Sequence, residues 1–504
     1  MKKLLSLLLV LSIIFSSAVW LFGCNDASSG GEGAGEVTCE EHVDRDSNDF
    51  CDACKRYLIV TLDFYAINDL HGKFCDTSKQ PGVDELGTYF EKREVLDENV
   101  ILLSTGDMWQ GTAESSLVKG KILTEWMNEL GFVSMTLGNH EYDWGEAAIR
   151  ENLAIAEFPF LAINIYDKTT GERVDYCQPS VMIERDGIQI GIIGAIGDCY
   201  SSISSDMVEN VTFKVGDELT ALVKAESERL RTLGADVIVY SLHDGDSGYS
   251  YYDRTLSRGY VDVVFEGHTH KSYSTVDNNG IYHIQGGGEN DGISHAEISI
   301  HLITGEKRVT EAEVIKSNKY KDLPDHAPTE ALEDKYSEII DFAYAEIGTV
   351  SSSMNDSQVE DFTAQLYLEA GIKKWGDKYD IVLGGGFLRT RAPYTLSAGV
   401  KTYADVFSLL PFDNRIVLCS VSGSKLKSKF INSRSEDYHV ALSEYGSTLS
   451  IDDNKTYYVV VDTYTALYAP NGLTIVEFFD DDTFARDLFA EAIGEGRLDA
   501  GRTD

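Results

Sequence analysis

Basic side chains are scarce in this sequence. Its 504 residues include 43 Lys and Arg against 83 Asp and Glu, which gives a formal net charge of −40. A surface of that charge repels nucleic acid polymers, so no polynucleotide partner is expected. A small phosphorylated substrate could still bind if metal ions and a few local arginines supplied the attraction.

Internal repeats and long low-complexity tracts are also lacking. The apolar content of 43% and the charged content of 25% are ordinary for a globular protein. The length is sufficient for two domains, each with its own buried core.

Charged residues are absent from the first long apolar run, Leu4 to Phe22, which follows Lys2 and Lys3. This pattern predicts a secretory leader. The run ends in Leu21 to Cys24, which resembles a bacterial lipobox, so residues 1–24 are predicted to be a lipoprotein-type signal peptide with lipidation at Cys24. The protein is then expected on the bacterial cell surface, contacting the membrane through its lipid anchor only. A plain secretory signal, which would give a secreted protein, or an uncleaved anchor is the alternative. A Ser/Gly-rich tether follows at residues 25–38.

Cysteines are few, eight in all, and setting Cys24 aside leaves an odd number that cannot all pair internally. A small module at residues 39–56 has the spacing of an additional structural zinc site with three thiolates and one imidazole. Its four candidate ligands are Cys39, His42, Cys51 and Cys54. A disulfide with a spare thiol is the alternative in an oxidising compartment. Acidic residues at 44–49 also resemble part of a calcium loop, without its complete pattern.

The middle of the chain alternates strand-like and helix-like patterns, which predicts an α/β domain at residues 57–320. Five apolar runs predict buried strands of one parallel-type sheet, at 59–67, 100–104, 133–137, 237–241 and 261–265. Helical spacing at 83–96 and 119–130 predicts crossover helices, and alternation at 281–285 and 295–302 predicts antiparallel strands. A connector helix, roughly 330–347 within residues 321–349, is expected to lead into a second α/β domain at 350–504.

A short polar motif follows each of the five runs. Ligands of open α/β sheets bind beyond the carboxyl ends of the strands, where these motifs would meet. The motifs offer seven oxygen and imidazole donors suited to divalent metals, namely Asp69, His71, Asp107, Asn139, His243, His268 and His270. Two adjacent ions can clamp a phosphoryl group and activate a water molecule, with Asp107 as the natural bridge between them.

Asn68 to Gly72, Gly106-Asp107, Gly138 to Glu141, His243-x-Gly245 and Gly267 to His270 resemble the motifs of calcineurin-like metallophosphoesterases. The run from Gly138 to Asp143 is similar to that of the extracellular 5′-nucleotidase branch. The resemblance covers roughly residues 57–479. It implies a metallophosphoesterase β-sandwich flanked by helices (αββα), followed by a second α/β domain of the 5′-nucleotidase type.

By this resemblance, one metal is held by Asp69, His71, Asp107 and His270. The other is held by Asp107, Asn139, His243 and His268. His140 and Asp143 are then the catalytic dyad, in which the carboxylate orients the imidazole toward phosphate or leaving-group oxygens. Mn, Zn, Fe or Co would suit these ligands alike.

The second domain also resembles the substrate domain of this branch. Gly384 to Arg389 and Leu410 to Asn414 match its glycine-arginine and proline-phenylalanine motifs, with one residue more before Arg389. The resemblance implies that Arg389 contacts a nucleotide and that Phe412 and Tyr464 stack on its base. Core packing is the alternative role for the two aromatic residues.

The sequence therefore predicts an exported two-metal phosphohydrolase that releases phosphate from nucleoside 5′-monophosphates or related nucleotides by means of metal-activated water. Three alternatives keep the chemistry and change the substrate: a 2′,3′-cyclic nucleotide phosphodiesterase, a nucleotide-sugar hydrolase or another phosphomonoesterase. A surface binding protein on a catalytically dead scaffold is the alternative from another class.

Overall fold

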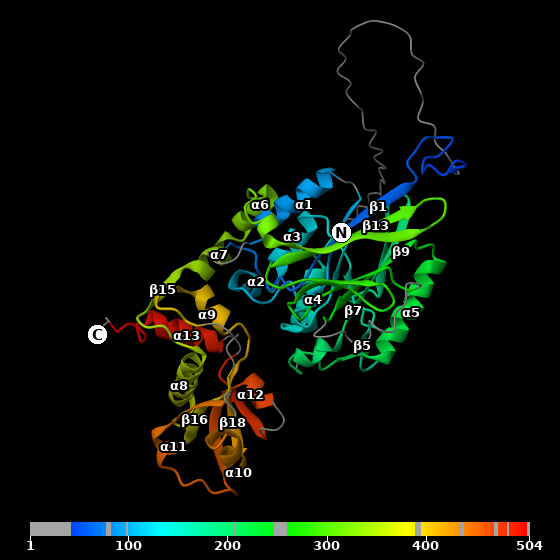
Figure 1. Cartoon of the computed structure of the whole chain (residues 1–504). Helices are drawn as coiled ribbons and strands as arrows, with labels where there is room; N and C mark the ends of the chain where they lie inside the picture. The colour runs from blue at the N-terminus through cyan, green and yellow to red at the C-terminus, as the bar shows by residue number, and fades with distance from the viewer. Residues whose placement is uncertain are drawn as a thin grey trace, which may run out of the picture. The chain divides into compact units, whose positions relative to one another are not determined.

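The computed structural model describes residues 42–76, 82–96, 99–205, 207–245, 260–388, 395–433, 438–467, 472–480 and 483–500 (Figure 1). Cys24, the tether, Cys39 and Arg389 lie outside the described residues. The chain divides into two compact units, Met1–Leu58 and Ile59–Asp504. Among the described helices, none combines the length and the apolar character needed to cross a membrane.

The larger unit begins with a six-stranded sheet whose order is β14-β13-β1-β2-β3-β4. Its parallel strands are β1 (Ile59–Ile67), β2 (Val100–Ser104), β3 (Ser134–Thr136) and β4 (Phe160–Leu161). Strands β13 (Gly292–His301) and β14 (Lys307–Lys316) continue it in antiparallel pairing. The helices between its parallel strands are α1 (Asp84–Leu96), α2 (Ala113–Leu117), α3 (Lys121–Glu129) and α4 (Gly145–Leu153).

A second six-stranded sheet has the order β11-β12-β10-β9-β7-β6. Its four inner strands run parallel: β12 (Tyr282–Gly286), β10 (Val263–Glu266), β9 (Val237–His243) and β7 (Ile188–Ile196). The edge strands β11 (Ser272–Val276) and β6 (Ser180–Arg185) pair antiparallel. Helix α5 (Asp217–Thr232) lies on the outer side of this sheet, opposite α1 and α3 (Figure 1), and β5 (Ile165–Asp167) pairs with β8 (Val211–Phe213) nearby.

The two sheets pack face to face through a shared core. Leu62 and Phe64 of β1 belong to the same buried cluster as Val239 of β9 and Phe265 of β10, and the rings of Phe64 and Phe265 are 6.5 Å apart. This is the helix-flanked sandwich that the family resemblance implied. The prediction of one sheet for all five runs is wrong, because a run buried on both faces does not reveal which strands it pairs with.

Two further predictions differ from the structure. The run at 281–285 is not purely antiparallel, since β12 pairs parallel with β10 and antiparallel with β11. The helix expected at 330–347 is two helices, α6 (Ala327–Lys335) and α7 (Ser337–Tyr344), followed by β15 (Glu346–Val350). The helix breaks at Tyr336, whose backbone leaves the helical region at φ −100° and ψ 12°.

The second α/β region is built on a five-stranded sheet of order β19-β16-β20-β18-β21. The strands are β16 (Ile381–Phe387), β18 (Ile416–Ser422), β19 (Tyr438–Leu442), β20 (Thr456–Asp462) and β21 (Leu473–Phe478), and β17 (Gly399–Thr402) pairs with β15. The helices are α8 (Asp356–Trp375), α9 (Tyr403–Leu409), α10 (Gly423–Lys425), α11 (Glu444–Thr448), α12 (Thr463–Leu467) and α13 (Ala485–Gly494). Helix α8 approaches β16 so closely that a Cβ on Gly384 would collide with its backbone.

Candidate active site

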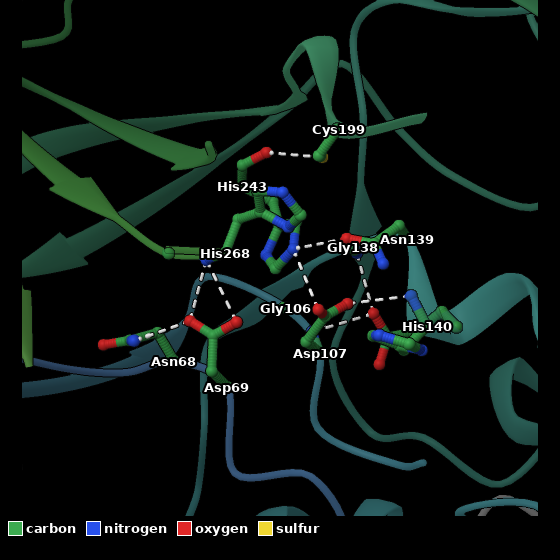
Figure 2. Close-up of polar contacts among 12 residues, drawn as sticks. Asn68, Asp69, Gly106, Asp107, Gly138, Asn139, His140, Cys199, His243 and His268 are labelled. Atoms are coloured by element: carbon green, nitrogen blue, oxygen red, sulfur yellow. Dashed lines mark hydrogen bonds and ion pairs between the residues drawn. The ribbon is translucent and has the colours of Figure 1, made fainter. Parts of the chain in front are cut away.

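The seven predicted metal donors lie at the carboxyl ends of strands in both sheets. Figure 2 shows five of them, namely Asp69, Asp107, Asn139, His243 and His268. From the first sheet, Asp69 and His71 follow β1, Asp107 follows β2 and Asn139 follows β3. From the second sheet, His243 ends β9, and His268 and His270 follow β10. The site therefore lies at one edge of the sandwich, where loops of the two sheets meet.

Five of these donors have a left-handed backbone, which non-glycine residues rarely adopt. Their φ angles are 50° at Asp69, 50° at His71, 55° at Asp107, 69° at His268 and 55° at His270. Such strained conformations cluster at functional sites, where surrounding bonds hold them in place.

One group of donors consists of Asp69, His71 and His270. Nε2 of His71 lies 2.9 Å from Nε2 of His270, and Oδ1 of Asp69 lies 3.4 Å from Nε2 of His270. Asp69 and His71 are fully buried, whereas His270 is partly exposed. Two imidazole nitrogens aimed at one another beside a carboxylate are the arrangement that a shared cation would satisfy.

A second group surrounds His243. Its Nε2 lies 3.2 Å from Oδ2 of Asp107 and 3.2 Å from Oδ1 of Asn139, and its ring is 5.5 Å from that of His268 (Figure 2). The two groups adjoin, because ligand atoms of His71, Asp107 and His140 lie within 4.8 Å of one another. The donors thus fit a pair of neighbouring divalent ions, with Asp107 at the junction.

Backbone carbonyls fix the imidazoles of both groups. Nδ1–H of His71 donates to the carbonyl of Gln110 at 2.9 Å, and Nδ1–H of His243 donates to the carbonyl of Thr105 at 2.7 Å. Because each Nδ1 carries its proton, each Nε2 is the atom presented to a metal.

The electrostatics of the site favour cations. Burial raises the pKa of Asp107, but the adjacent His243 and His140 more than offset this and hold it well below its ordinary value. Conversely, burial lowers the pKa of His243, yet Asp107 dominates and raises it to about 10. The raised pKa favours a proton on Nε2 of His243. A metal ion binding at Nε2 would compete with that proton, so metal affinity should depend on pH.

His140 and Asp143 form a hydrogen-bonded pair beside the donors. Nδ1–H of His140 donates to Oδ2 of Asp143 at 2.8 Å, and the backbone N–H of His140 donates to Oδ1 of Asp107 at 2.8 Å. Burial raises the pKa of Asp143, an effect that His140 opposes. The pair is one-fifth exposed, in contrast to the adjacent Asp107, which is buried.

A pocket of about 430 Å³ adjoins this pair. Its lining includes His140 and Asp143 together with the aromatic side chains of Phe412 and Tyr464. Phe412 is 39% exposed and Tyr464 is 44% exposed, so neither ring is packed in the core. Asp462, at the end of β20, also lines this pocket.

Comparison with known proteins identifies the first domain. Residues 62–272 match the calcineurin-like phosphoesterase family. The first domain of this chain is a calcineurin-like phosphoesterase domain. It is accordingly a metal-dependent phosphoric ester hydrolase, of a family that uses a dinuclear divalent metal centre.

Similarity to individual phosphoesterases extends into the second domain. Apyrase from Tabanus yao is 26% identical over 410 residues, covering 73% of this chain and 72% of that protein. Protein UshA from Escherichia coli (strain K12) is 25% identical over 431 residues, covering 74% and 75%. The 5′-nucleotidase precursor from Thermus thermophilus shares the fold with a TM-score of 0.65 at 19% identity, over 86% of this chain and 96% of its own.

Two residues of this phosphoesterase received no role in the sequence analysis. The buried carboxylate of Glu141 accepts hydrogen bonds from the amides of Asp107, Met108 and Gly138, at 2.9, 2.9 and 2.7 Å. It thereby ties the β2 loop to the β3 loop, and its position within the Gly138 to Asp143 run was a usable signal. Cys199 lies within 4.8 Å of ligand atoms of two predicted donor histidines, and nothing in its sequence surroundings indicated this.

Proposed function

We propose that this phosphoesterase hydrolyses nucleoside 5′-monophosphates to nucleoside and phosphate. The observation that carries the proposal is the pocket shared by His140, Asp143, Phe412 and Tyr464. It offers a polar end beside the metal donors and exposed aromatic rings for a flat base. The names of relatives also support it, since a snake venom 5′-nucleotidase of Gloydius brevicauda is 32% identical over 219 residues, covering 40% of this chain and 36% of that protein.

In this proposal the donors divide as the family resemblance implies. One divalent ion would be held by Asp69, His71, Asp107 and His270, and the other by Asp107, Asn139, His243 and His268. Once bound, such a pair neutralises phosphate charge and lowers the pKa of a water molecule.

His140 acts on the departing side of the phosphate. With Nδ1–H engaged by Asp143, the other ring nitrogen is directed to phosphate oxygens or to the leaving alkoxide. A positioned imidazole there stabilises the negative charge that develops in the transition state. Asp143 holds the tautomer and makes the imidazole more basic.

Phe412 and Tyr464 would stack on the two faces of the base. Stacking binds a flat ring without hydrogen bonds to its edges. The segment carrying Phe412 is anchored for that task. Arg486 donates to the carbonyl of Phe412 at 3.0 Å and pairs with Asp413, which also accepts from Nε1–H of Trp144 at 2.9 Å. The family resemblance implies Arg389, outside the described residues, as a further nucleotide contact.

The location proposed for the enzyme is the bacterial cell surface, with lipid attached at Cys24. The leader-like run and the lipobox resemblance support it. Labelling cells with a radioactive or clickable fatty acid should mark the wild-type protein and leave Cys24→Ala unmarked. Marking of both proteins equally would exclude anchoring through this residue.

A hydrolysis screen in which substrates and all products are separated by chromatography tests the activity, because opening a cyclic phosphate or splitting a nucleotide-sugar releases no inorganic phosphate. Full-length protein loaded with Mn²⁺, Zn²⁺ or Co²⁺ is given AMP, ribose 5-phosphate, 2′,3′-cyclic AMP and UDP-glucose, with Asp107→Ala as the inactive control. We expect kcat/KM to be highest for AMP. A higher kcat/KM for the cyclic nucleotide or the nucleotide-sugar would identify that compound as the substrate instead. Equal rates on AMP and ribose 5-phosphate would show that the enzyme does not recognise the base. No turnover by metal-loaded protein would indicate a binding protein.

A further inference from the structure

A second group of metal-binding side chains lies in the small N-terminal unit. Ligand atoms of His42, Cys51 and Cys54 all lie within 4.8 Å of one another, and Sγ of Cys54 is 3.5 Å from Nδ1 of His42. Cys51 is fully buried, and neither cysteine is joined in a disulfide. Two thiols and an imidazole are the ligand types of structural zinc sites.

The backbone around Cys51 is arranged to stabilise a thiolate. The chain folds back in a turn in which the amide of Lys55 donates to the carbonyl of Cys51 at 2.9 Å, and Lys55 itself is left-handed at φ 62°. Backbone hydrogen bonds from Cys54 and Val43 lower the pKa of the Cys51 thiol to about 5. Such donors hold a ligating sulfur in its charged form and in a fixed orientation.

Little else holds this segment folded. Of residues 42–58, all of which the structure describes, only Cys51 and Leu58 are buried. A segment of this size cannot form a sufficient hydrophobic core, and natural modules of such size rely on a metal ion or a disulfide.

The neighbouring acidic loop is engaged in its own hydrogen bonds. The carboxylate of Asp44 accepts from the amides of Asn48 and Asp49 at 3.2 and 3.0 Å, and that of Asp52 accepts from the amide of Arg45 at 3.1 Å. These bonds shape the loop between His42 and Cys51. The loop therefore acts as the frame that brings the imidazole to the two sulfurs.

We propose that His42, Cys51 and Cys54 bind a structural zinc ion that holds the N-terminal module folded, independently of the catalytic metal pair. Soft thiolate and imidazole ligands select zinc over calcium or magnesium. Cys39, the fourth ligand predicted from the sequence, lies outside the described residues.

Metal analysis of the full chain tests the inference. Asp107→Ala serves as the background, so that zinc in the catalytic centre contributes little, and Cys51→Ser is added to it. We expect Cys51→Ser to remove about one zinc per chain from this background. Cys199→Ala in the same background is the matched control, because Cys199 is a buried thiol near other histidines, and it should retain the zinc.

Cobalt substitution and proteolysis supply two further readouts. The Co²⁺ form of the background protein should show thiolate-to-cobalt absorption in the near ultraviolet, lost in the Cys51→Ser protein and kept in the Cys199→Ala protein. Zn²⁺ should protect Arg45, Lys55 and Arg56 from trypsin only when Cys51 is present. The inference is overturned if the mass of the native protein shows that Cys51 and Cys54 are joined in a disulfide. It is also overturned if Cys51→Ser leaves the zinc content unchanged, or if Ca²⁺ rather than Zn²⁺ protects the module from trypsin.

Discussion

The hydrogen bond between His140 and Asp143 permits a graded test of the catalytic assignment. Replacing Asp143 with Asn keeps an acceptor for Nδ1–H of His140 but removes the charge, and replacing it with Ala removes the bond as well. A hydrogen bond to a charged group contributes about 1.5–3 kcal/mol, against about 0.5–1.5 kcal/mol for a neutral one. Asp143→Asn should therefore lower kcat about tenfold, and Asp143→Ala should lower it between about 10- and 150-fold.

The assay is steady-state phosphate release from AMP at saturating substrate, with the bound metal measured in each protein. Metal content should be unchanged, because neither residue is among the proposed ligands. Repeating the series with p-nitrophenyl phosphate separates two roles of the imidazole. If His140 assists the leaving alkoxide, the loss should shrink with this better leaving group, whereas stabilisation of phosphate oxygens alone should give equal losses.

A remote pair provides the control. Nδ1–H of His439 donates to Oδ1 of Asp361 at 2.8 Å, the same distance as in the catalytic pair. Asp361→Asn should leave kcat within about twofold of the wild-type value. The assignment fails if Asp143→Asn retains full activity, if it loses metal in proportion to activity, or if Asp361→Asn is equally impaired.

Three other predictions address the pocket, the metal loops and stability. Tyr464→Ala should raise KM for AMP by about 5- to 150-fold, equivalent to about 1–3 kcal/mol of stacking, and should leave KM for ribose 5-phosphate unchanged. Tyr445→Ala is the control, because Tyr445 has a similar exposed fraction of 42%. Equal effects of Tyr464→Ala on both substrates would contradict stacking. Gly138→Ala should abolish metal binding measured by calorimetry, because its Cβ would collide with the Asp107 carboxylate, and retained affinity would show that the loop can yield. Burial and neighbouring acidic charge raise the pKa of Asp84 from 3.8 to about 7. As pH rises, the unfolded chain loses the Asp84 proton before the folded chain does, so the stability of the fold decreases between these two pH values. Asp84→Asn should therefore raise Tm at pH 8 but not at pH 4, and a higher Tm at both would point to another cause.

The sequence predicted the metal donors best where a polar residue comes at or just after the end of an apolar run. Asp69, Asp107 and His243 each end or follow an apolar run, and the rule that ligands bind beyond strand carboxyl ends was enough to bring them together. The assignment of those runs to one sheet failed, because burial on both faces looks the same in either sheet of a sandwich. The connector was predicted as one helix because its helical spacing persists across Tyr336, where the backbone turns. Glu141 lies within a run that the sequence analysis singled out, but its contacts with three amides depend on the conformations of two loops, which that run alone does not specify.

The same loop contacts hold the strained backbone of the donors in place. A left-handed backbone costs about 1–2 kcal/mol for each non-glycine residue, and five of the donors adopt it. The offset comes from bonds between loops: Glu141 accepts from the amides that follow β2, and the Asp69 carboxylate accepts from the amide of His268 at 3.0 and 2.8 Å, which joins one sheet to the other. Beneath them, hydroxyls of Thr136 and Ser241 are 2.6 Å apart across the two sheets. Since these bonds depend on both sheets, the metal donors should lose their arrangement only when the sandwich itself opens, and metal binding should raise the stability of the whole domain rather than of one loop.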